Sequence, residues 1–364
     1  MSEDALDKLR RQIDDIDAQL LELFNRRAAC AIEVAEIKRE RVDSDDENIN
    51  FFRPDREAQV IKRVKSMNQG PLSDDEVGRL IREVMSACLA LEQPLKIAYL
   101  GPEGTFTQSA ALKHFGHSVS TVPMSSIPDV FNSVESRHAD YGLVPVENST
   151  EGVISHTLDM FMNSHLKVCG EVEIPIHHHL ATRSQEVSTI KRIYSHQQSF
   201  AQCRRWLDQN LPGIERLPVS SNAEAARLAG LEDEAAAICG LPAVEIFGLK
   251  VCYENIEDLP DNSTRFVIIG QQDVDPSGND KTSLLISTRN VPGALLGLLQ
   301  PLADHGISMN KIESRPAQGH KWAYVFFIDI DGHQRDTNVT EALNELKQQA
   351  SLFKILGSYP KASL

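Results

Sequence analysis

The sequence predicts a multidomain protein with an all-α first region, a two-lobed α/β middle region and a ferredoxin-like βαββαβ last region. Apolar residues follow a 3–4 spacing up to Arg41, strands and helices then alternate through polar turns, and a strand-helix-strand-strand-helix-strand order ends the chain. Because 364 residues exceed one typical hydrophobic core, two or three domains are expected. The predicted boundaries are 1–92, 96–272 and 281–364.

The composition limits the kinds of partner. Lys and Arg number 37 against 52 Asp and Glu, so the formal net charge is −15, which opposes nucleic acid and anionic membranes as partners. The start of the chain is charged and contains no apolar targeting or membrane segment. The six cysteines form no CxxC pair, which is typical of reduced thiols. We therefore expect a cytoplasmic protein with no nucleic-acid or membrane partner.

The first region predicts one long helix that needs a partner. The apolar 3–4 spacing from Leu6 to Ile37 contains no Pro or Gly, so it predicts a helix of roughly 50 Å whose apolar seam cannot be buried alone. A second subunit is the simplest partner, which predicts a homodimer or a higher oligomer. Arg27 occupies a seam position and either sets the register or forms an anion site inside the bundle.

Other charged residues extend the anion-site hypothesis. Lys38 lies about 20° around the helix from Arg27, so the two side chains point the same way. Arg10 lies roughly 100° away and suits the equivalent pocket of a partner subunit. A second helix should begin at Pro54, and a third should follow the capping box of Ser73 and Glu76.

This pattern, from the long helix to the segment IREVMSACLALE that ends at Glu92, resembles the small all-helical chorismate mutases, which are intertwined dimers. The resemblance implies a pocket lined by Arg27, Lys38, Arg56, Glu57 and Glu92, with Arg10 supplied by the other subunit. The rearrangement of chorismate to prephenate is intramolecular, so it needs cations and donors that clamp a dicarboxylate and stabilise charge on the ether oxygen. Glu92 can donate to that oxygen only when it is protonated, so we expect its pKa to be raised.

The middle region predicts a doubly wound α/β fold with polar turns at the carboxyl ends of its strands. These turns are GPEGTFT (101–107), ENSTEG (147–152), SHQQSF (195–200) and SSNAE (220–224), and a further polar cluster, DNSTRF (261–266), leads into the strand 267–269. Ligands of such folds bind beyond the carboxyl strand ends, where helix N-termini suit anions. GPEGTF lacks both the dinucleotide glycine spacing and a P-loop lysine, and consecutive strand histidines (177–179) cannot converge on a metal. No cofactor or metal is expected.

Together the turns GPEGTFT, PVENS, SHQQSF and TRF resemble prephenate dehydratase. The resemblance implies two lobes, 96–174 with 263–272 and 175–262, with the site in the cleft between them. It implies Thr264, Arg265 and Phe266 at the core of the site, surrounded by Thr105, Asn148, Ser149, Glu151 and His196.

The dehydratase reaction expels carbon dioxide and the ring hydroxyl, so the departing oxygen needs a hydrogen-bond donor or a proton. The resemblance makes Thr264 the expected donor, while Glu147, Glu151 and His196 remain open as the source of the proton. Arg265 would pair with a substrate carboxylate or hold the two lobes together.

The last region resembles the ACT regulatory domain through its segments GALL and ESRP. The resemblance implies a phenylalanine site made by Asn290, Gly293, Ala294, Leu295, Glu313, Ser314 and Arg315. A plain folding or dimerisation module is the alternative.

The three resemblances imply an enzyme that takes chorismate through prephenate to phenylpyruvate and is inhibited by phenylalanine. An enzyme that uses arogenate is one alternative. Another is a non-catalytic, amino-acid-responsive binding protein, against which Arg27, Lys38 and Glu92 together argue.

Overall fold

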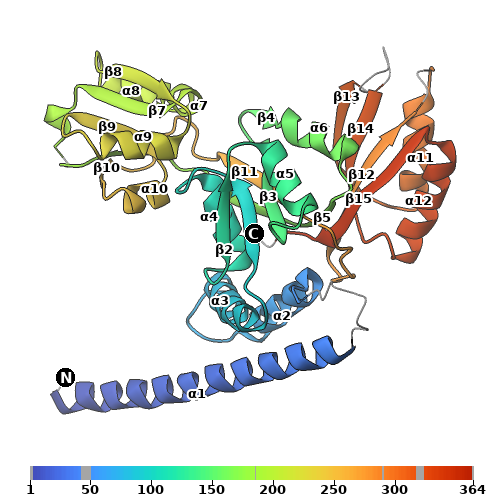
Figure 1. Ribbon diagram of the computed structural model, residues 1–364, viewed down its shortest axis with the longest axis horizontal. Coiled ribbons are helices and arrows are strands. Elements are labelled where there is room, and N and C mark those ends of the chain that lie inside the picture. Colours follow the sequence, from blue (N-terminus) through green and yellow to red (C-terminus); the bar gives the residue numbers. More distant parts are fainter. Residues whose placement is uncertain (1–2, 42–50, 185, 289–290, 317–323, 363–364) are drawn as a thin grey trace. The chain divides into compact units, whose positions relative to one another are not determined.

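The computed structural model describes residues 3–41, 51–184, 186–288, 291–316 and 324–362 (Figure 1). The chain forms two compact units, one of residues up to 95 with 115–119 and one of residues 96–114 with 120–364. The first is helical and the second contains three β-sheets, which confirms the multidomain fold class. Among the described helices, none combines the length and apolar character that a membrane span requires.

The helical unit begins with α1 (Glu3–Arg41), an unbroken helix of 39 residues. Its apolar seam is exposed in the single chain, from Leu6 (50%) through Ile16 (53%) to Ile37 (47%). Two shorter helices follow, α2 (Pro54–Met67) and α3 (Asp74–Glu92). The predicted cap at Ser73 is confirmed, because its hydroxyl accepts a hydrogen bond from the Glu76 N–H at 3.2 Å. The exposed seam is the surface on which a partner helix would have to pack.

The first lobe of the larger unit is a mixed sheet in the order β2-β1-β3-β11-β5, with β4 paired to β3. Its elements are β1 (Lys96–Leu100), α4 (Phe106–Phe115), β2 (Ser120–Met124), α5 (Ile127–Glu135), β3 (Tyr141–Asn148), β4 (Gly152–Val153), α6 (Ser155–Asn163), β5 (Lys167–Pro175) and β11 (Ser263–Gly270). The sheet is mixed, since β11 runs antiparallel to both β3 and β5. This reversal brings the first residues of β11 to the edge where β3 ends, with Thr264 opposite Asn148.

The second lobe has its own sheet in the order β10-β6-β9-β7-β8. Its elements are β6 (His179–Thr182), the short 3₁₀ helix η1 (Val187–Thr189), β7 (Arg192–His196), α7 (Gln197–Gln202), α8 (Arg204–Asn210), β8 (Glu215–Val219), α9 (Asn222–Ala229), β9 (Ala235–Cys239), α10 (Leu241–Ile246) and β10 (Lys250–Tyr253). Buried alanines on α9 and β9 let this helix lie close to the sheet. Ser221 caps α9 by accepting from the Glu224 N–H at 3.0 Å.

The last region is a four-stranded antiparallel sheet in the order β13-β14-β12-β15, with α11 and α12 on one face (Figure 1). Its elements are β12 (Asp280–Ser287), α11 (Ala294–Asp304), β13 (Met309–Pro316), β14 (Tyr324–Asp331), α12 (Thr337–Gln349) and β15 (Leu352–Pro360). This order confirms the ferredoxin-like prediction.

The opposite face of this last sheet packs on the first lobe. Leu285, Phe327 and Leu356 lie in one hydrophobic core with Val144 and Phe161 of the first lobe. The backbones also meet, because a Cβ added at Gly357 would lie 2.1 Å from the Val168 carbonyl oxygen. The last sheet is therefore an integral part of the larger unit and not a tethered appendage.

Candidate functional sites

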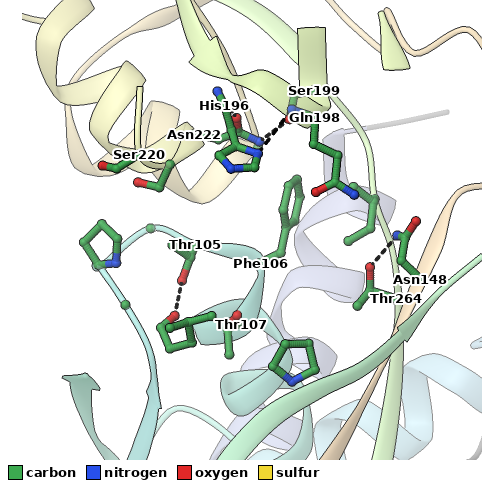
Figure 2. A pocket seen from close by; sticks show the side chains of 18 of the residues that line it. Thr105, Phe106, Thr107, Asn148, His196, Gln198, Ser199, Ser220, Asn222 and Thr264 are labelled. Atoms are coloured by element: carbon green, nitrogen blue, oxygen red, sulfur yellow. Dashed lines mark hydrogen bonds between the residues drawn. The ribbon is translucent and has the colours of Figure 1, made fainter. Parts of the chain in front are cut away.

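A cavity of about 650 Å³ lies between the two lobes, and both contribute to its walls (Figure 2). Figure 2 shows Thr105, Asn148 and Thr264 of the first lobe around the same space as His196, Ser199 and Asn222 of the second. The predicted residues that line it are Thr105, Asn148, His196, Thr264 and Phe266. Lining residues that the sequence analysis missed include Phe106, His178, Ser199, Gln202 and Asn222. Among the described residues that line this cavity, none is Lys, Arg, Asp or Glu.

The hydrogen-bond direction at Thr264 can be followed from the backbone. The Asn148 side-chain oxygen accepts from the N–H groups of Thr150 and Glu151, both at 3.0 Å, which fixes its amide so that Nδ2 is the donor. Asn148 Nδ2 then shares its two hydrogens among three acceptors, Thr264 Oγ1 at 2.8 Å, Asn262 Oδ1 at 2.9 Å and the Ser263 carbonyl at 3.1 Å. Because the Thr264 oxygen is an acceptor in this bond, its own hydrogen is left to donate into the cavity.

The same logic makes His196 and Ser199 donors. The His196 Nδ1 atom accepts from the Gln198 N–H at 3.3 Å, so the neutral ring carries its proton on Nε2. The backbone N–H of His196 donates to Asn222 Oδ1 at 3.0 Å, which turns Asn222 Nδ2 toward Ser199 Oγ at 2.8 Å. Thr264, His196 and Ser199 therefore each have an acceptor atom occupied within the protein and a hydrogen available for a ligand. A cavity lined in this way suits an anion rich in acceptor oxygens.

Two of the three open proton sources lie outside the cavity lining. The Glu147 carboxylate pairs with Lys311 Nζ at 2.7 Å, and the exposed Glu151 touches the site only through its backbone N–H to Asn148. His196 is the one of the three that lines the cavity. The structure also separates the three consecutive histidines, because His177 contacts Glu257, His178 contacts Gln202 and His179 accepts from the Asn255 N–H. No group of three or more metal-ligating side chains occurs in the described parts of the chain.

Arg265 lies on the opposite face of β11 from Thr264 and Phe266, because successive strand residues alternate. Its guanidinium is 2.8 Å from Glu171 Oε2 and 2.7 Å from Asp329 Oδ2, and it is absent from the cavity lining. The structure therefore contradicts its expected place beside the substrate and across the lobes. Arg265 instead connects the first lobe to the last sheet.

Ser149 also has a different position from the expected one. Its hydroxyl accepts from the Ser263 N–H at 2.9 Å and donates to the Asp261 carbonyl at 3.3 Å, and the residue is exposed outside the cavity. Ser149 therefore fastens the segment that leads into β11 and does not face the ligand space.

The helical unit brings several predicted cations and acids together. Lys38 Nζ lies 4.0 Å from Glu92 Oε2, which is buried without a hydrogen bond among the described residues. The charge of Arg27 also acts on the pKa of the Glu92 carboxyl, so both cations of α1 influence the end of α3. Glu57 on α2 pairs with Arg82 on α3 at 3.2 Å, and Arg82 is a partner that the sequence analysis missed.

Two predicted cations of this pocket face solvent in the single chain. Arg10 pairs with Asp7 of its own helix at 3.3 Å, and its side chain is 66% exposed. Arg56 is exposed at the start of α2. Their positions leave open the expected role of Arg10 in a partner's pocket.

Comparisons with known proteins identify three families along the chain. Family models match for chorismate mutase type II at residues 9–93, prephenate dehydratase at 97–274 and the ACT domain at 282–348. A Pseudomonas aeruginosa protein named bifunctional chorismate mutase/prephenate dehydratase is 52% identical over 363 residues, covering 100% of this chain and 99% of that protein. This chain belongs to the bifunctional chorismate mutase/prephenate dehydratase family. An Escherichia coli relative of the same name is 29% identical and covers 100% of this chain and 98% of its own length.

Solved structures resemble about three quarters of this bifunctional enzyme. Prephenate dehydratase from Arthrobacter aurescens in complex with L-Phe has a TM-score of 0.68 and 37% identity, covering 74% of this chain and 90% of that one. A structure described as GqqA, a quorum-quenching acylase, has the same TM-score with 28% identity, covering 74% of this chain and 98% of that one. The fold alone therefore does not fix the chemistry, and the full-length relatives carry the family assignment.

Burial of Glu92 beside Lys38 affects its protonation. Burial raises the pKa of Glu92, although the charges of Lys38, Arg27 and Arg39 oppose the shift. Burial likewise raises the pKa of Glu57, against the effect of Arg82. A raised pKa favours the protonated Glu92 that can donate a hydrogen bond to the ether oxygen of chorismate.

We expect mutase turnover to fall as pH rises through the raised pKa of Glu92, because the donor proton is lost. The Glu92→Gln variant keeps an N–H donor at every pH, so its pH profile should be flat on the alkaline side. Steady-state mutase rates of both proteins across the pH range check this expectation. An identical profile in the two proteins would show that Glu92 is not the titrating donor.

The predicted phenylalanine residues lie on two elements of the ACT domain. Gly293 is the N-cap of α11 with a φ of 78°, and Ala294 and Leu295 begin that helix. On β13, Arg315 pairs with Asp159 at 2.9 Å and donates to Ser155 at 2.7 Å, both on α6 of the dehydratase lobe. Of the other β13 residues, Glu313 is half-buried and Ser314 is exposed. Asn290 lies outside the described residues.

Proposed function

We propose that the cavity between the two lobes binds prephenate and converts it to phenylpyruvate. The proposal rests on three hydrogen-bond donors that face the cavity, Thr264 Oγ1, His196 Nε2 and Ser199 Oγ. Each donor is oriented by a series of hydrogen bonds that starts at a backbone N–H. Prephenate brings two carboxylates, a ketone and a ring hydroxyl, all of which accept hydrogen bonds. Neutral donors and helix N-termini can hold such a dianion without cationic side chains.

In the proposed reaction, the bond between the ring and its carboxylate breaks and carbon dioxide leaves. The released electron pair enters the ring as the bond to the hydroxyl oxygen breaks, and that oxygen takes a proton and departs as water. Thr264 donates a hydrogen bond to this oxygen as negative charge grows on it. Of the three open proton sources, His196 lines the cavity, and it can give the proton only from its imidazolium form, in which Nδ1 no longer accepts from the Gln198 N–H.

The cavity lining favours prephenate over arogenate. Arogenate carries an ammonium group where prephenate has its ketone, and a buried ammonium needs an anionic or multiple-acceptor partner. The lining contains neither Asp nor Glu among its described residues, and the donors identified above face the ligand. A higher dehydratase kcat/KM for prephenate than for arogenate is therefore expected.

The helical unit supports the first step, from chorismate to prephenate. Lys38, Arg27 and a protonated Glu92 supply the cations and the donor that a rearranging dicarboxylate needs. The exposed apolar seam of α1 supports a homodimer in which Arg10 completes the partner's pocket. A cytoplasmic enzyme without a metal or cofactor remains our prediction.

Inhibition by phenylalanine would act through the ACT domain. The L-Phe complex of the Arthrobacter aurescens relative supports this ligand. The ion pairs of Lys311 with Glu147 and of Arg315 with Asp159 join β13 to the dehydratase lobe. Phenylalanine must favour a state with a poorer dehydratase cleft, through unequal affinity for two arrangements.

The direct test supplies purified protein with prephenate or arogenate in separate assays, each with and without phenylalanine. We expect phenylpyruvate from prephenate, little turnover of arogenate, and a lower rate when phenylalanine is added. No phenylpyruvate from prephenate would overturn the proposed dehydratase function, and an unchanged rate with phenylalanine would overturn only its regulation.

A further inference from the structure

Asn262 is a buried polar residue just before β11 that does not line the cavity. Its side chain is 3% exposed and contacts both lobes. Toward the first lobe, Asn262 Oδ1 accepts from Asn148 Nδ2 at 2.9 Å and from Thr150 Oγ1 at 3.1 Å. Toward the second lobe, Asn262 Nδ2 lies 3.3 Å from Gln202 Oε1.

The donors and acceptors in this series of hydrogen bonds are determined by the first lobe. Asn148 Nδ2 must donate, because its Oδ1 is held by two backbone N–H groups. Asn262 Oδ1 must therefore accept, which leaves Asn262 Nδ2 to donate to Gln202 Oε1. The oxygen of Gln202 then faces away from the ligand, and its N–H₂ group is the part available to the cavity that Gln202 lines.

His178 cannot determine the orientation of Gln202 by itself. Its Nε2 atom lies 2.8 Å from Gln202 Oε1, while its Nδ1 atom is buried with no hydrogen-bond partner among the described residues. The tautomer with its hydrogen on Nε2 would donate to the Gln202 oxygen, and the tautomer with its hydrogen on Nδ1 would accept from the Gln202 N–H₂ group, so His178 fits either orientation of the amide. Asn262 removes this ambiguity, because only the Gln202 oxygen can accept its N–H.

We infer that Asn262 is a positioning residue that turns the Gln202 amide so that its N–H₂ group faces the substrate. The inference rests on the dehydratase function proposed above. It explains why a residue outside the cavity is buried between the lobes with both ends of its amide bonded. It also adds Gln202 to the donors that receive the acceptor oxygens of the substrate.

The Asn262→Asp variant gives the sharpest test. A carboxylate keeps the acceptor for Asn148 but presents a second acceptor to Gln202, so the Gln202 amide must turn its oxygen to the cavity. We expect the KM for prephenate to rise on the order of tenfold, the effect of losing one hydrogen bond to a charged group. The Asn262→Ala variant removes the bias without reversing it, so its KM should lie between those of Asn262→Asp and the wild type.

A double-mutant cycle separates this effect from the added charge. In a Gln202→Leu background the Asn262→Asp substitution has no amide to turn, so it should change KM by less than about twofold. The Thr282→Val variant is the matched stability control, because Thr282 is fully buried in the ACT sheet with hydrogen bonds to Gly332 and Ser358. Its dehydratase KM should equal that of the wild type, and urea unfolding of the full chain reports the stability of the larger unit in every variant.

The outcomes are distinct. A KM increase of equal size in the presence and absence of Gln202 would overturn the inference, as would a wild-type KM in Asn262→Asp. Wild-type protein that fails to turn over prephenate would instead contradict the dehydratase function itself.

Discussion

The Thr264→Val variant is expected to lose dehydratase turnover by on the order of 10²–10³-fold, because it lacks the donor at the departing oxygen. Valine keeps the branched shape of threonine, so the cavity wall is preserved. The Asn148 amide is not left unpaired either, since Nδ2 still reaches Asn262 Oδ1 at 2.9 Å and the Ser263 carbonyl at 3.1 Å. The measurement is the kcat for phenylpyruvate formation from prephenate.

Two comparisons make this result specific. Thr264→Ser retains the hydroxyl and should keep much of the turnover, whereas Thr264→Val and Thr264→Ala should not. Mutase turnover of the same proteins should stay at the wild-type level, because the helical unit contributes its own residues to that step. Dehydratase kcat within a few-fold of the wild type in Thr264→Val would rule out the donor role.

The Arg265→Met variant is expected to destabilise the larger unit by about 3–5 kcal/mol, because it leaves buried carboxylates without their shared cation. Burial opposes the charge of Arg265, but Tyr359, Asp329 and Glu171 outweigh it and raise its pKa. Lys281 also lies 2.8 Å from Glu171, so Asp329 is the carboxylate that loses most. Urea unfolding of the full chain measures the change in the free energy of unfolding.

Matched variants test whether burial is the cause. Arg216→Met breaks the more exposed ion pair with Asp208, 2.7 Å in the structure, and should cost no more than about 1 kcal/mol. Adding Asp329→Asn to Arg265→Met removes the orphaned charge and should recover part of the lost stability. If Arg265→Met and Arg216→Met have equal effects, the cluster at Arg265 does not join the first lobe to the ACT sheet.

The long helix and the strand-turn-helix order were predictable because their signals are local. Periodicity identified α1, the Ser73 cap identified the start of α3, and the polar turns led to the cavity edge. The alternation of side chains along β11 was also predictable from the sequence. In a strand, Thr264 and Phe266 must share one face, and Arg265 must lie on the other. Treating the three consecutive residues as one site overlooked that alternation.

Other features depend on contacts between distant segments. Asn262 lies in a turn typical of exposed loops, yet its amide is buried between Asn148 and Gln202, which are far away in the sequence. The pairing of Glu57 with Arg82 similarly requires the packing of α2 on α3. The lining side chains act as donors because their acceptor atoms are occupied. This can be seen only when the backbone N–H groups that begin each series of hydrogen bonds are located in the structure.

The most direct test follows both products after purified full-length protein is supplied with chorismate alone. Two sites in one chain predict that prephenate forms first and phenylpyruvate follows, and that the Thr264→Val variant accumulates prephenate at the wild-type mutase rate. Chorismate that remains unchanged, or prephenate that never proceeds to phenylpyruvate in the wild type, would contradict the assignment of two consecutive reactions to this chain.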